Sequence, residues 1–389
     1  MEEQFSQSDL TSLDYEMSAF VIKLSRRWLD QEFVDLSDVS DHKFVETMTM
    51  LGHQVRSRTT HDDTVFEFRV INHRPDCYCV IGLAREAAAA FNKPMKHHEP
   101  VVKGCDTCSI YELLDVDVPA MDLCNRYTSR MIKNVKIGSS PEWLCQRLRD
   151  HGIHPVNNII DISNYVMLEY GQPIHAFDYR CVSNGEIVVR EAEDGEVLIT
   201  ADGILRQLKS GMLIIASESH PIGLAGIKCS DEAQISDDTE MIVYEAASFN
   251  GACIRQTATA FGLQTDAILR MESNPDPMMT IPAIDRVCEL VELLECGEVL
   301  DGIIDILNYV PEPKTLDLES EKLNRLLESD ISEADMVSYL NRLEIPVEGR
   351  SILVPSFRSD INSLADIAAE VRRLQECDQM TATTSETTT

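Results

Sequence analysis

Hydrophobic residues recur along this chain with two different spacings, and the changes between them predict a mixture of helices and strands. Residues 35–55 predict a helix with Phe44, Val45, Met48 and Leu51 on one face and Gly52 at its end. Residues 64–71, TVFEFRVI, alternate between apolar and polar as a half-buried strand does. Residues 80–93 are rich in alanine and stop before Pro94, which predicts a second helix.

Both spacings continue through the middle of the chain. Ser139 and Glu142 form a predicted capping box at the start of a helix that Gly152 ends. Asn250 caps a later helix, which Gly262 ends. The pattern also predicts strands at 186–190, 212–216 and 241–245 and a long amphipathic helix at 281–295. We therefore expect an α+β fold in several domains, with a mixed, largely antiparallel sheet in the central one.

The stretch from Asn157 to Asp178, NNIIDISNYVMLEYGQPIHAFD, combines an apolar run with many hydrogen-bonding side chains. Buried polar groups need partners, so we expect a core element whose polar edge faces a pocket. Gly171 and Pro173 break the run, and His175 is predicted on a short, stiff loop after them. The histidine either binds or polarises a ligand there or is a structural residue held by a neighbour.

Charge limits what the chain can bind. Its 389 residues, 44% of them hydrophobic, suffice for two or three domains with cores. Lys and Arg number 34 against 66 Asp and Glu, which gives a net charge of −32. Such a chain repels RNA at long range, so RNA binding requires a local basic patch or a basic partner. The few candidates for a patch are Arg126, Arg130, Lys133, Lys136, Arg147 and Arg149.

Cysteine and apolar content point to the cytoplasm. No apolar run approaches the ~20 residues of a membrane span, and the N-terminus is acidic, so we expect no membrane partner. Twelve cysteines fit that compartment as reduced thiols. The pairs Cys77–Cys79 and Cys105–Cys108 are compatible with a four-ligand zinc site, although we favour small buried thiols. No glycine-rich phosphate loop occurs, so we expect no ATP site.

Three stretches of the sequence resemble the beta chain of bacterial phenylalanyl-tRNA synthetase. They are HRPDCYCVIGLAREAAAAF, the run that ends in DISNYVMLEYGQPIHAFD, and LVPSFRSDINSLADIAAEVRRL. The resemblance implies a flexible extension (1–18), an N-terminal α+β domain (19–98), a connector (99–123), an editing domain (124–310), a winged-helix-like domain (313–378) and a disordered tail (379–389). The family's inserted oligonucleotide-binding barrel is absent, because Val55 leads almost directly to Thr64, and His73 replaces an asparagine.

The resemblance also implies an editing pocket in the central domain. His175, Asn164 and Glu245 are its implied catalytic residues, and Glu245 also accepts the hydroxyl group of a misacylated tyrosine. Such a second site is needed because a pocket for phenylalanine cannot strongly reject an added hydroxyl group. The pair Cys229–Ser230 stands where the family has two glycines. The implied substrate-binding residues are Ser163, Pro173, Gly226, Glu245 and Ala267.

For the last domain the resemblance implies a Mg²⁺ site. Its ligands map to Asp360, Asp366 and Glu370, while Ala369 stands where the family has a fourth ligand, which weakens the site. The alternative is that Asp360 caps the following helix and that Asp366 and Glu370 form its exposed face.

Three functions follow from the resemblance. The first is hydrolytic editing of tyrosyl-tRNA(Phe), without aminoacylation by this chain. The second is a non-catalytic binding or regulatory role towards RNA or an amino acid. The third is a subunit of a phenylalanine-tRNA ligase assembly, together with an alpha-type chain.

Overall fold

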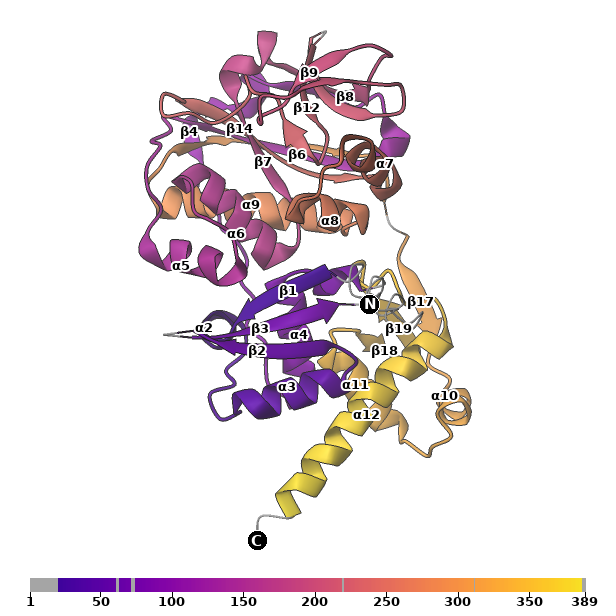
Figure 1. Cartoon of the computed structure of the whole chain (residues 1–389). Coiled ribbons are helices and arrows are strands. Elements are labelled where there is room, and N and C mark those ends of the chain that lie inside the picture. The colour runs from indigo at the N-terminus through magenta and orange to yellow at the C-terminus, as the bar shows by residue number, and fades with distance from the viewer. Residues whose placement is uncertain (1–19, 61–62, 71–73, 219, 311, 387–389) are drawn as a thin grey trace, which may run out of the picture. The chain divides into compact units, whose positions relative to one another are not determined.

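The computed structural model describes residues 20–60, 63–70, 74–218, 220–310 and 312–386, which form two compact units (Figure 1). The first unit draws on residues 1–78, 83–96 and 314–389, and the second, central unit on residues 79–82 and 97–313. Both contain helices and mainly antiparallel strands, which confirms the predicted α+β class. The expected extension at 1–18 and His73 lie outside the described residues.

The first unit has two three-stranded antiparallel sheets, ordered β1-β3-β2 and β17-β19-β18. Phe44 and Met48 of its helix α3 are fully buried, as the helical spacing predicts. The bounds are β1 Phe20–Ser25, α2 Arg26–Trp28, α3 Asp41–Met50, β2 Gln54–Thr59, β3 Thr64–Val70, α4 Val80–Phe91, β17 Lys314–Asp317, α10 Ser320–Leu327, α11 Glu333–Arg342, β18 Val347–Glu348, β19 Ser351–Val354 and α12 Leu364–Glu386.

The central unit has a six-stranded sheet, β4-β15-β6-β14-β7 with β16 on β6, and a five-stranded sheet, β13-β12-β11-β8-β5. Its strands are β4 Cys105–Ser109, β5 Asp115–Asp117, β6 Cys124–Lys133, β7 Ile174–Asp178, β8 Glu186–Glu191, β9 Val197–Ile199, β10 Leu205–Gln207, β11 Leu213–Ser217, β12 His220–Leu224, β13 Lys228–Cys229, β14 Met241–Phe249, β15 Glu298–Asp301 and β16 Ile304–Leu307. Its helices are α5 Glu142–His151, α6 Asn158–Tyr170, α7 Gly251–Phe261, α8 Asp266–Glu272 and α9 Thr280–Leu293.

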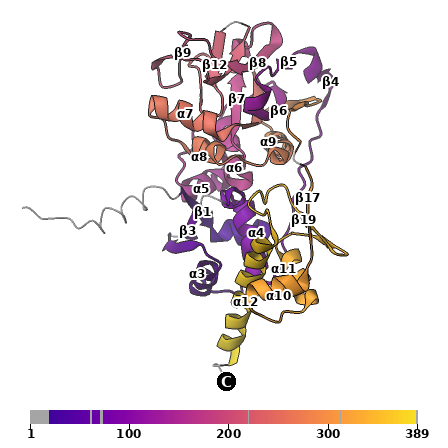
Figure 2. The ribbon, with the colours of Figure 1, turned by 90° about the vertical axis from the view of Figure 1, so that its right-hand side faces the viewer.

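The two sheets of the central unit enclose its main hydrophobic core. Side chains from β6, β7 and β14 of one sheet and from β8, β11 and β12 of the other meet there, among them Tyr127, Phe177 and Ile215. Helices α6 and α9 pack against the opposite face of the six-stranded sheet, on the same side in both views (Figures 1 and 2). Each central strand of that sheet therefore turns alternate residues to the helices and to the main core.

The structure differs from the sequence-based expectations about local structure at the start of α5 and at the end of α12. Helix α5 begins at Glu142 with Pro141 as its N-cap and without the expected side-chain cap from Ser139, and the Ser140 hydroxyl donates to Asp161 (2.6 Å). Within the expected connector at 99–123, β4 and β5 join the two sheets. The expected disordered tail continues α12 to Glu386, since extending an existing helix costs much less free energy than starting one.

Candidate functional site

The predicted core element at 157–178 is helix α6 followed by strand β7. The Asn157 side chain accepts a hydrogen bond from the Ile160 N–H and so starts the helix, and Gly171 ends it in the left-handed conformation (φ 76°). His175 lies on β7 and not on a loop, because residues 174–178 pair with β14. The strand is hard to recognise in the sequence, because its five residues follow the helix after a break of only three residues.

Strand pairing brings His175 and Glu245 side by side. In the antiparallel register Glu245 of β14 lies opposite His175 of β7 on one side and opposite Ser129 of β6 on the other. Residues that face each other in this way carry their side chains on the same face of the sheet. The row Ser129–Glu245–His175 therefore points towards the main core, away from α6 and α9.

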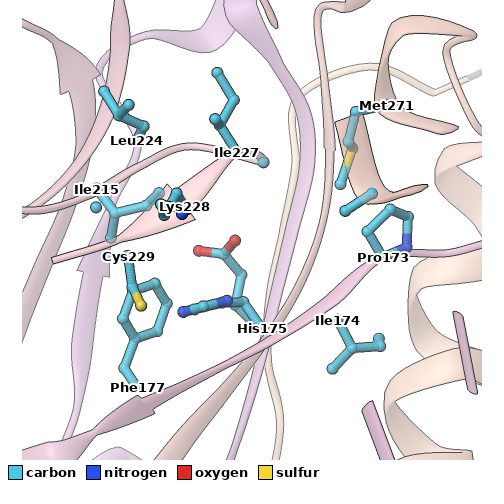
Figure 3. Close-up of a pocket in the computed structure, with 14 residues that line it drawn as sticks. Pro173, Ile174, His175, Phe177, Ile215, Leu224, Ile227, Lys228, Cys229 and Met271 are labelled. Atoms are coloured by element: carbon cyan, nitrogen blue, oxygen red, sulfur yellow. The ribbon is translucent and has the colours of Figure 1, made fainter. Parts of the chain in front are cut away.

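A pocket opens above this row (Figure 3), and its empty space, part of it open to solvent, is about 420 Å³. Five of the predicted site residues line it: Pro173, His175, Gly226, Glu245 and Ala267. The remaining wall is largely apolar, and Figure 3 shows Phe177 beside His175 and Met271 near Pro173. A largely apolar pocket with a few converging polar groups is the usual form of a site for a small molecule or a side chain.

Two predicted residues, Ser163 and Asn164, are absent from the pocket lining. Both lie on α6, and the Ser163 hydroxyl donates to the Ile159 carbonyl one turn earlier (3.1 Å). Proximity in sequence to His175 did not place them beside it, because the Gly171 turn separates the helix from the strand.

The pocket environment favours the uncharged forms of both titratable residues. Glu245 is 4% exposed, and desolvation raises the pKa of its carboxyl group to about 8. Burial lowers the pKa of His175 to about 4, and its Nε2 atom is shielded from solvent without a hydrogen-bond partner. At pH 7 the pocket therefore presents a carboxylic acid beside a neutral imidazole.

Gly226 and Cys229 shape the wall opposite the row. Gly226 adopts φ +65°, and a Cβ atom there would lie 3.1 Å from the Phe249 ring, so both backbone and space require glycine. Cys229 lines the pocket and is buried, which raises the pKa of its thiol to about 11. From the sequence, Cys229 was noted only as a departure from the family pattern.

Phe177 was not predicted as a site residue. It lies two residues after His175, so strand alternation would have placed it on the same face of β7.

Comparison with known proteins places this unit and the C-terminal segment in known families. Residues 123–296 match the B3/4 domain, and residues 316–376 match the tRNA synthetase B5 domain. Phenylalanine--tRNA ligase beta subunits are 39% identical over 334 residues in Clostridium tetani and 36% identical over 338 residues in Fusobacterium nucleatum. The chain therefore contains a B3/4 domain and a tRNA synthetase B5 domain and is similar to phenylalanine--tRNA ligase beta subunits. Those two matches cover 84% and 85% of this chain but 42% of each relative, so the chain spans about four-tenths of their length.

A solved structure supports the fold of this beta-subunit-like chain. An N-terminal fragment of the phenylalanyl-tRNA synthetase beta-subunit from Pyrococcus horikoshii matches with a TM-score of 0.50 and 14% identity. The match covers 92% of this chain and 100% of the fragment. No helix in the described part of the beta-subunit-like chain is long and apolar enough to cross a membrane.

The implied Mg²⁺ ligands of the beta-subunit-like chain do not form a metal-binding group. Asp360 accepts two hydrogen bonds from Arg358 (2.9 and 2.8 Å), and Glu370 accepts one from the same guanidinium (2.7 Å). Asp366 instead accepts from the N–H groups of Asn362 and Ser363 at the start of α12. Because two of the carboxylates are bound to arginine, the residues do not fit a Mg²⁺ ion, whose site needs free oxygens. The helix-capping role falls to Asp366 and not, as the alternative expected, to Asp360.

The carboxylates around Arg358 extend into a buried ion network in the first unit. Arg74 donates to Asp76 and to Glu86 (2.6 Å), and Arg373 donates to both Glu86 and Glu370. Glu86, Arg358 and Glu370 are at most 7% exposed. We call these residues the arginine network: Arg74, Asp76, Glu86, Arg358, Asp360, Glu370 and Arg373.

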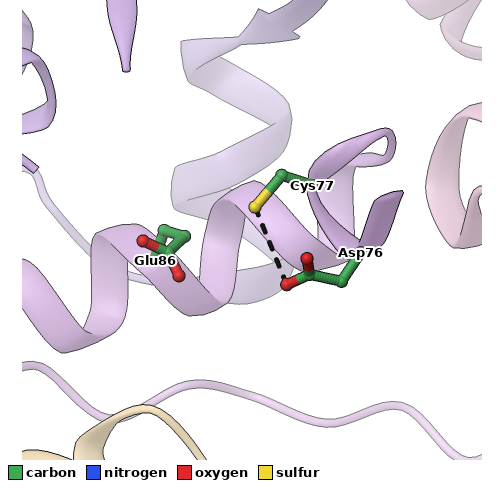
Figure 4. A group of neighbouring side chains, drawn as sticks. All are labelled: Asp76, Cys77 and Glu86. Atoms are coloured by element: carbon green, nitrogen blue, oxygen red, sulfur yellow. Dashed lines mark hydrogen bonds between the residues drawn. The ribbon is translucent and has the colours of Figure 1, made fainter. Parts of the chain in front are cut away.

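Asp76, Cys77 and Glu86 are the group among the described residues whose ligand atoms lie close enough to hold a metal ion (Figure 4). The Arg74 guanidinium hydrogen-bonds all three, which puts a cation where a metal ion would have to bind. No ligand cluster in the described part of the chain joins the two cysteine pairs either. Cys77 and Cys79 are buried, in line with the thiol interpretation.

The candidate basic patch is largely neutralised within the central unit. Arg126 pairs with Asp305 (2.7 Å), Arg130 with Asp285 (2.6 Å) and Arg149 with Glu142 (2.7 Å). Lys133 lies 3.7 Å from Glu298. These cations therefore offer little net positive potential to a phosphate backbone.

Proposed function

We propose that this chain hydrolyses tyrosyl-tRNA(Phe), with the tyrosine side chain bound in the pocket between Glu245 and Met271. The observation that supports this most is the largely apolar pocket in which Glu245 and His175 are cross-strand neighbours. The family relationship is consistent with it, because the named relatives are subunits of a ligase for phenylalanine.

Selectivity follows from the polar group inside an apolar pocket. The walls accommodate the aromatic ring of either amino acid, whereas the buried Glu245 carboxyl gains a partner only from a phenolic hydroxyl. A phenylalanine ring leaves that carboxyl unsatisfied, which costs about 1–3 kcal/mol. The pocket therefore retains tyrosine and releases phenylalanine.

Hydrolysis requires little more than a positioned water molecule. Water attacks the ester carbonyl, the bond to the ribose oxygen breaks, tyrosine leaves and the proton returns to the terminal ribose hydroxyl. Neutral His175 accepts a hydrogen bond from this water through Nε2 and orients it, since its lowered pKa makes it a weak base at pH 7. Asn164, which does not line the pocket, is the implied catalytic residue that this geometry supports least.

The test is release of tyrosine from tyrosyl-tRNA(Phe) by the full chain and by single variants. We expect His175→Ala to lower the rate about 100-fold, as loss of a positioning or proton-transfer group does. Glu245→Ala should lower hydrolysis of tyrosyl-tRNA(Phe). His154→Ala, which removes an exposed histidine between α5 and α6, is the matched control. Asn164→Ala tests whether this residue takes part in hydrolysis although it does not line the pocket.

A binding role without hydrolysis is the second candidate, and the pocket wall favours it. Cys229 fills space where the resemblance predicts glycine, and the candidate basic residues are paired, so a more basic partner would have to bring the RNA. We propose an alpha-type ligase subunit as that partner, since the relatives are named as beta subunits. Hydrolysis that appears only after an alpha-type subunit is added supports this assembly. No hydrolysis by either preparation leaves the binding role and rejects editing.

A further inference from the structure

Unsatisfied polar atoms are concentrated behind the pocket. In the described part of the chain, Tyr127 Oη, Ser129 Oγ, Glu245 Oε2 and His175 Nε2 are all shielded from solvent. None of them has a partner at full hydrogen-bond geometry, although Tyr127 and Glu245 lie close enough to interact. Tyr127 and Ser129 are 0% exposed and Glu245 is 4% exposed. Because buried polar atoms are nearly always hydrogen-bonded, four such atoms in one place indicate a site that is completed by a ligand or by water.

The strand register explains why these atoms lie together. Ser129 lies opposite Glu245, and Tyr127 lies opposite Ala247, one pair further along the same face of β6 and β14. Facing side chains start about 5 Å apart and diagonal ones about 7–8 Å apart, which is within the reach of a tyrosine. Both hydroxyl groups therefore approach the Glu245 carboxyl from the β6 side.

Tyr127 and Ser129 are not part of the pocket wall, whereas Glu245 and His175 are. The tyrosine belongs to the main hydrophobic core, packed with residues such as Met131 and Ala247. The two hydroxyl groups therefore reach Glu245 from behind, and a molecule in the pocket touches Glu245 from the front.

We propose that Tyr127 and Ser129 are positioning residues of this pocket, whose hydroxyl groups hold one oxygen of the Glu245 carboxyl so that the other meets the hydroxyl of a bound 4-hydroxyphenyl group. The inference rests on the proposed function for its ligand, but the placement of the carboxyl can be measured without any hydrolysis. Nothing in the sequence pattern marks these residues, because the run RYTSRM has the pattern of an ordinary buried strand.

Electrostatics in the pocket agree with this arrangement. Burial raises the pKa of Tyr127 well above its ordinary value, so the phenol stays protonated and can donate. Its interaction with Glu245 lowers the pKa of that carboxyl, against the larger effect of desolvation. The other titratable groups that face Glu245 are Cys124 of β6, His175 of β7, and Lys228 and Cys229 of β13. Lys228 is bound to Asp202 (3.1 Å).

The experiment compares full-length wild type with Tyr127→Phe, Ser129→Ala and the double variant. Tyr179→Phe is the matched control, because it also removes a phenol hydroxyl from this unit, one that donates to the Leu113 carbonyl (2.6 Å) outside the pocket. Binding of L-tyrosinamide and L-phenylalaninamide is measured by calorimetry. The protonation of Glu245 is followed by infrared spectroscopy against pH, with Glu245→Gln used to assign its carboxyl band.

We expect Tyr127→Phe to reduce the preference for tyrosinamide about tenfold, the effect of one net hydrogen bond, while phenylalaninamide binding stays within about twofold. The Glu245 band should shift and its titration move to higher pH, with both changes larger in the double variant and absent in Tyr179→Phe. An unchanged band and titration in the double variant overturn the inference, whether or not the amides bind. If the band shifts in the variants but wild type neither prefers tyrosinamide nor releases tyrosine, the proposed function alone is rejected.

Discussion

Two buried polar clusters in this chain use similar residues and satisfy them in opposite ways. In the arginine network each carboxylate meets a guanidinium: Glu86 binds Arg74 and Arg373, and Glu370 binds Arg358 and Arg373. In the pocket, Glu245 has no cationic partner, and its neighbours are hydroxyl groups and a neutral imidazole. The first cluster keeps its charges, and the second loses them.

The pKa shifts follow from this difference. The neighbouring arginines hold the pKa of Glu370 at about 2 in spite of burial, whereas desolvation alone dominates at Glu245 and raises its pKa to about 8. A fully paired cluster holds segments of one fold together. A cluster with unpaired, uncharged groups is costly unless a further molecule binds, so it indicates a functional site.

The strongest test of the contrast is to unbalance the arginine network. Glu86→Gln leaves Arg74 and Arg373 buried without their shared counter-charge, and we expect the free energy of unfolding of the first unit to fall by about 3–5 kcal/mol. The chain has two tryptophans, so denaturation can be followed through Trp28 in a Trp143→Phe background.

The control for this loss is Glu344→Gln, which removes the partner of Arg85 at a more exposed ion pair. It should cost less than about 1 kcal/mol. Equal losses in the two variants would show that burial and pairing do not distinguish the network from a surface ion pair.

The second test uses the pH dependence of the pocket. The folded chain keeps Glu245 protonated up to about pH 8, while the unfolded chain releases the proton near its ordinary value of 4.5. Stability is therefore lost as pH rises between these two values. Glu245→Gln cannot ionise, so its central unit should be more stable than wild type at pH 8 by a few kcal/mol, roughly 1.4 kcal/mol per pKa unit.

This difference is measured by denaturation at pH 5 and pH 8 through Trp143, in a Trp28→Phe background. The exposed Glu298→Gln variant should keep the wild-type pH dependence. If the Glu245→Gln chain is no more stable than wild type at pH 8, Glu245 is not a buried acid without a cationic partner.

The smallest expected effect concerns Mg²⁺. Because Asp360 and Glu370 are held by Arg358, millimolar MgCl₂ should shift the unfolding midpoint of the first unit no more than KCl of equal ionic strength. A specific stabilisation by Mg²⁺ that disappears in Asp360→Asn would mean that the carboxylates can leave their arginines to bind the ion.

Local sequence signals predicted much of the fold, and long-range pairing explains what they missed. Asn250 and Gly262 bound α7 as expected, and Gly171 ends α6, because caps and left-handed turns depend on a few neighbouring residues. Ser139 does not cap α5, whose N-cap is Pro141, and Ser140 beside it donates to Asp161 of α6. A bond of this kind between segments is visible only once the helices are packed.

Part of the candidate site could also be predicted from the sequence. Resemblance supplied Pro173, His175, Gly226, Glu245 and Ala267, which the fold brings together. It also supplied Asn164 and Ser163, which stay on α6. Tyr127 and Ser129 could not be found, since only the register between β6 and β14, more than 100 residues apart in sequence, sets them behind Glu245.

The arginine network also affects the order in which the two units can fold during synthesis of the chain. Glu86 and Arg373 are 287 residues apart in the chain, and residues 97–313 of the central unit are encoded between them. At about 5–20 residues per second, the ribosome makes this partner of Glu86 roughly 15–60 s after the glutamate itself. During that interval the central unit can fold, whereas the first unit waits for its last helix.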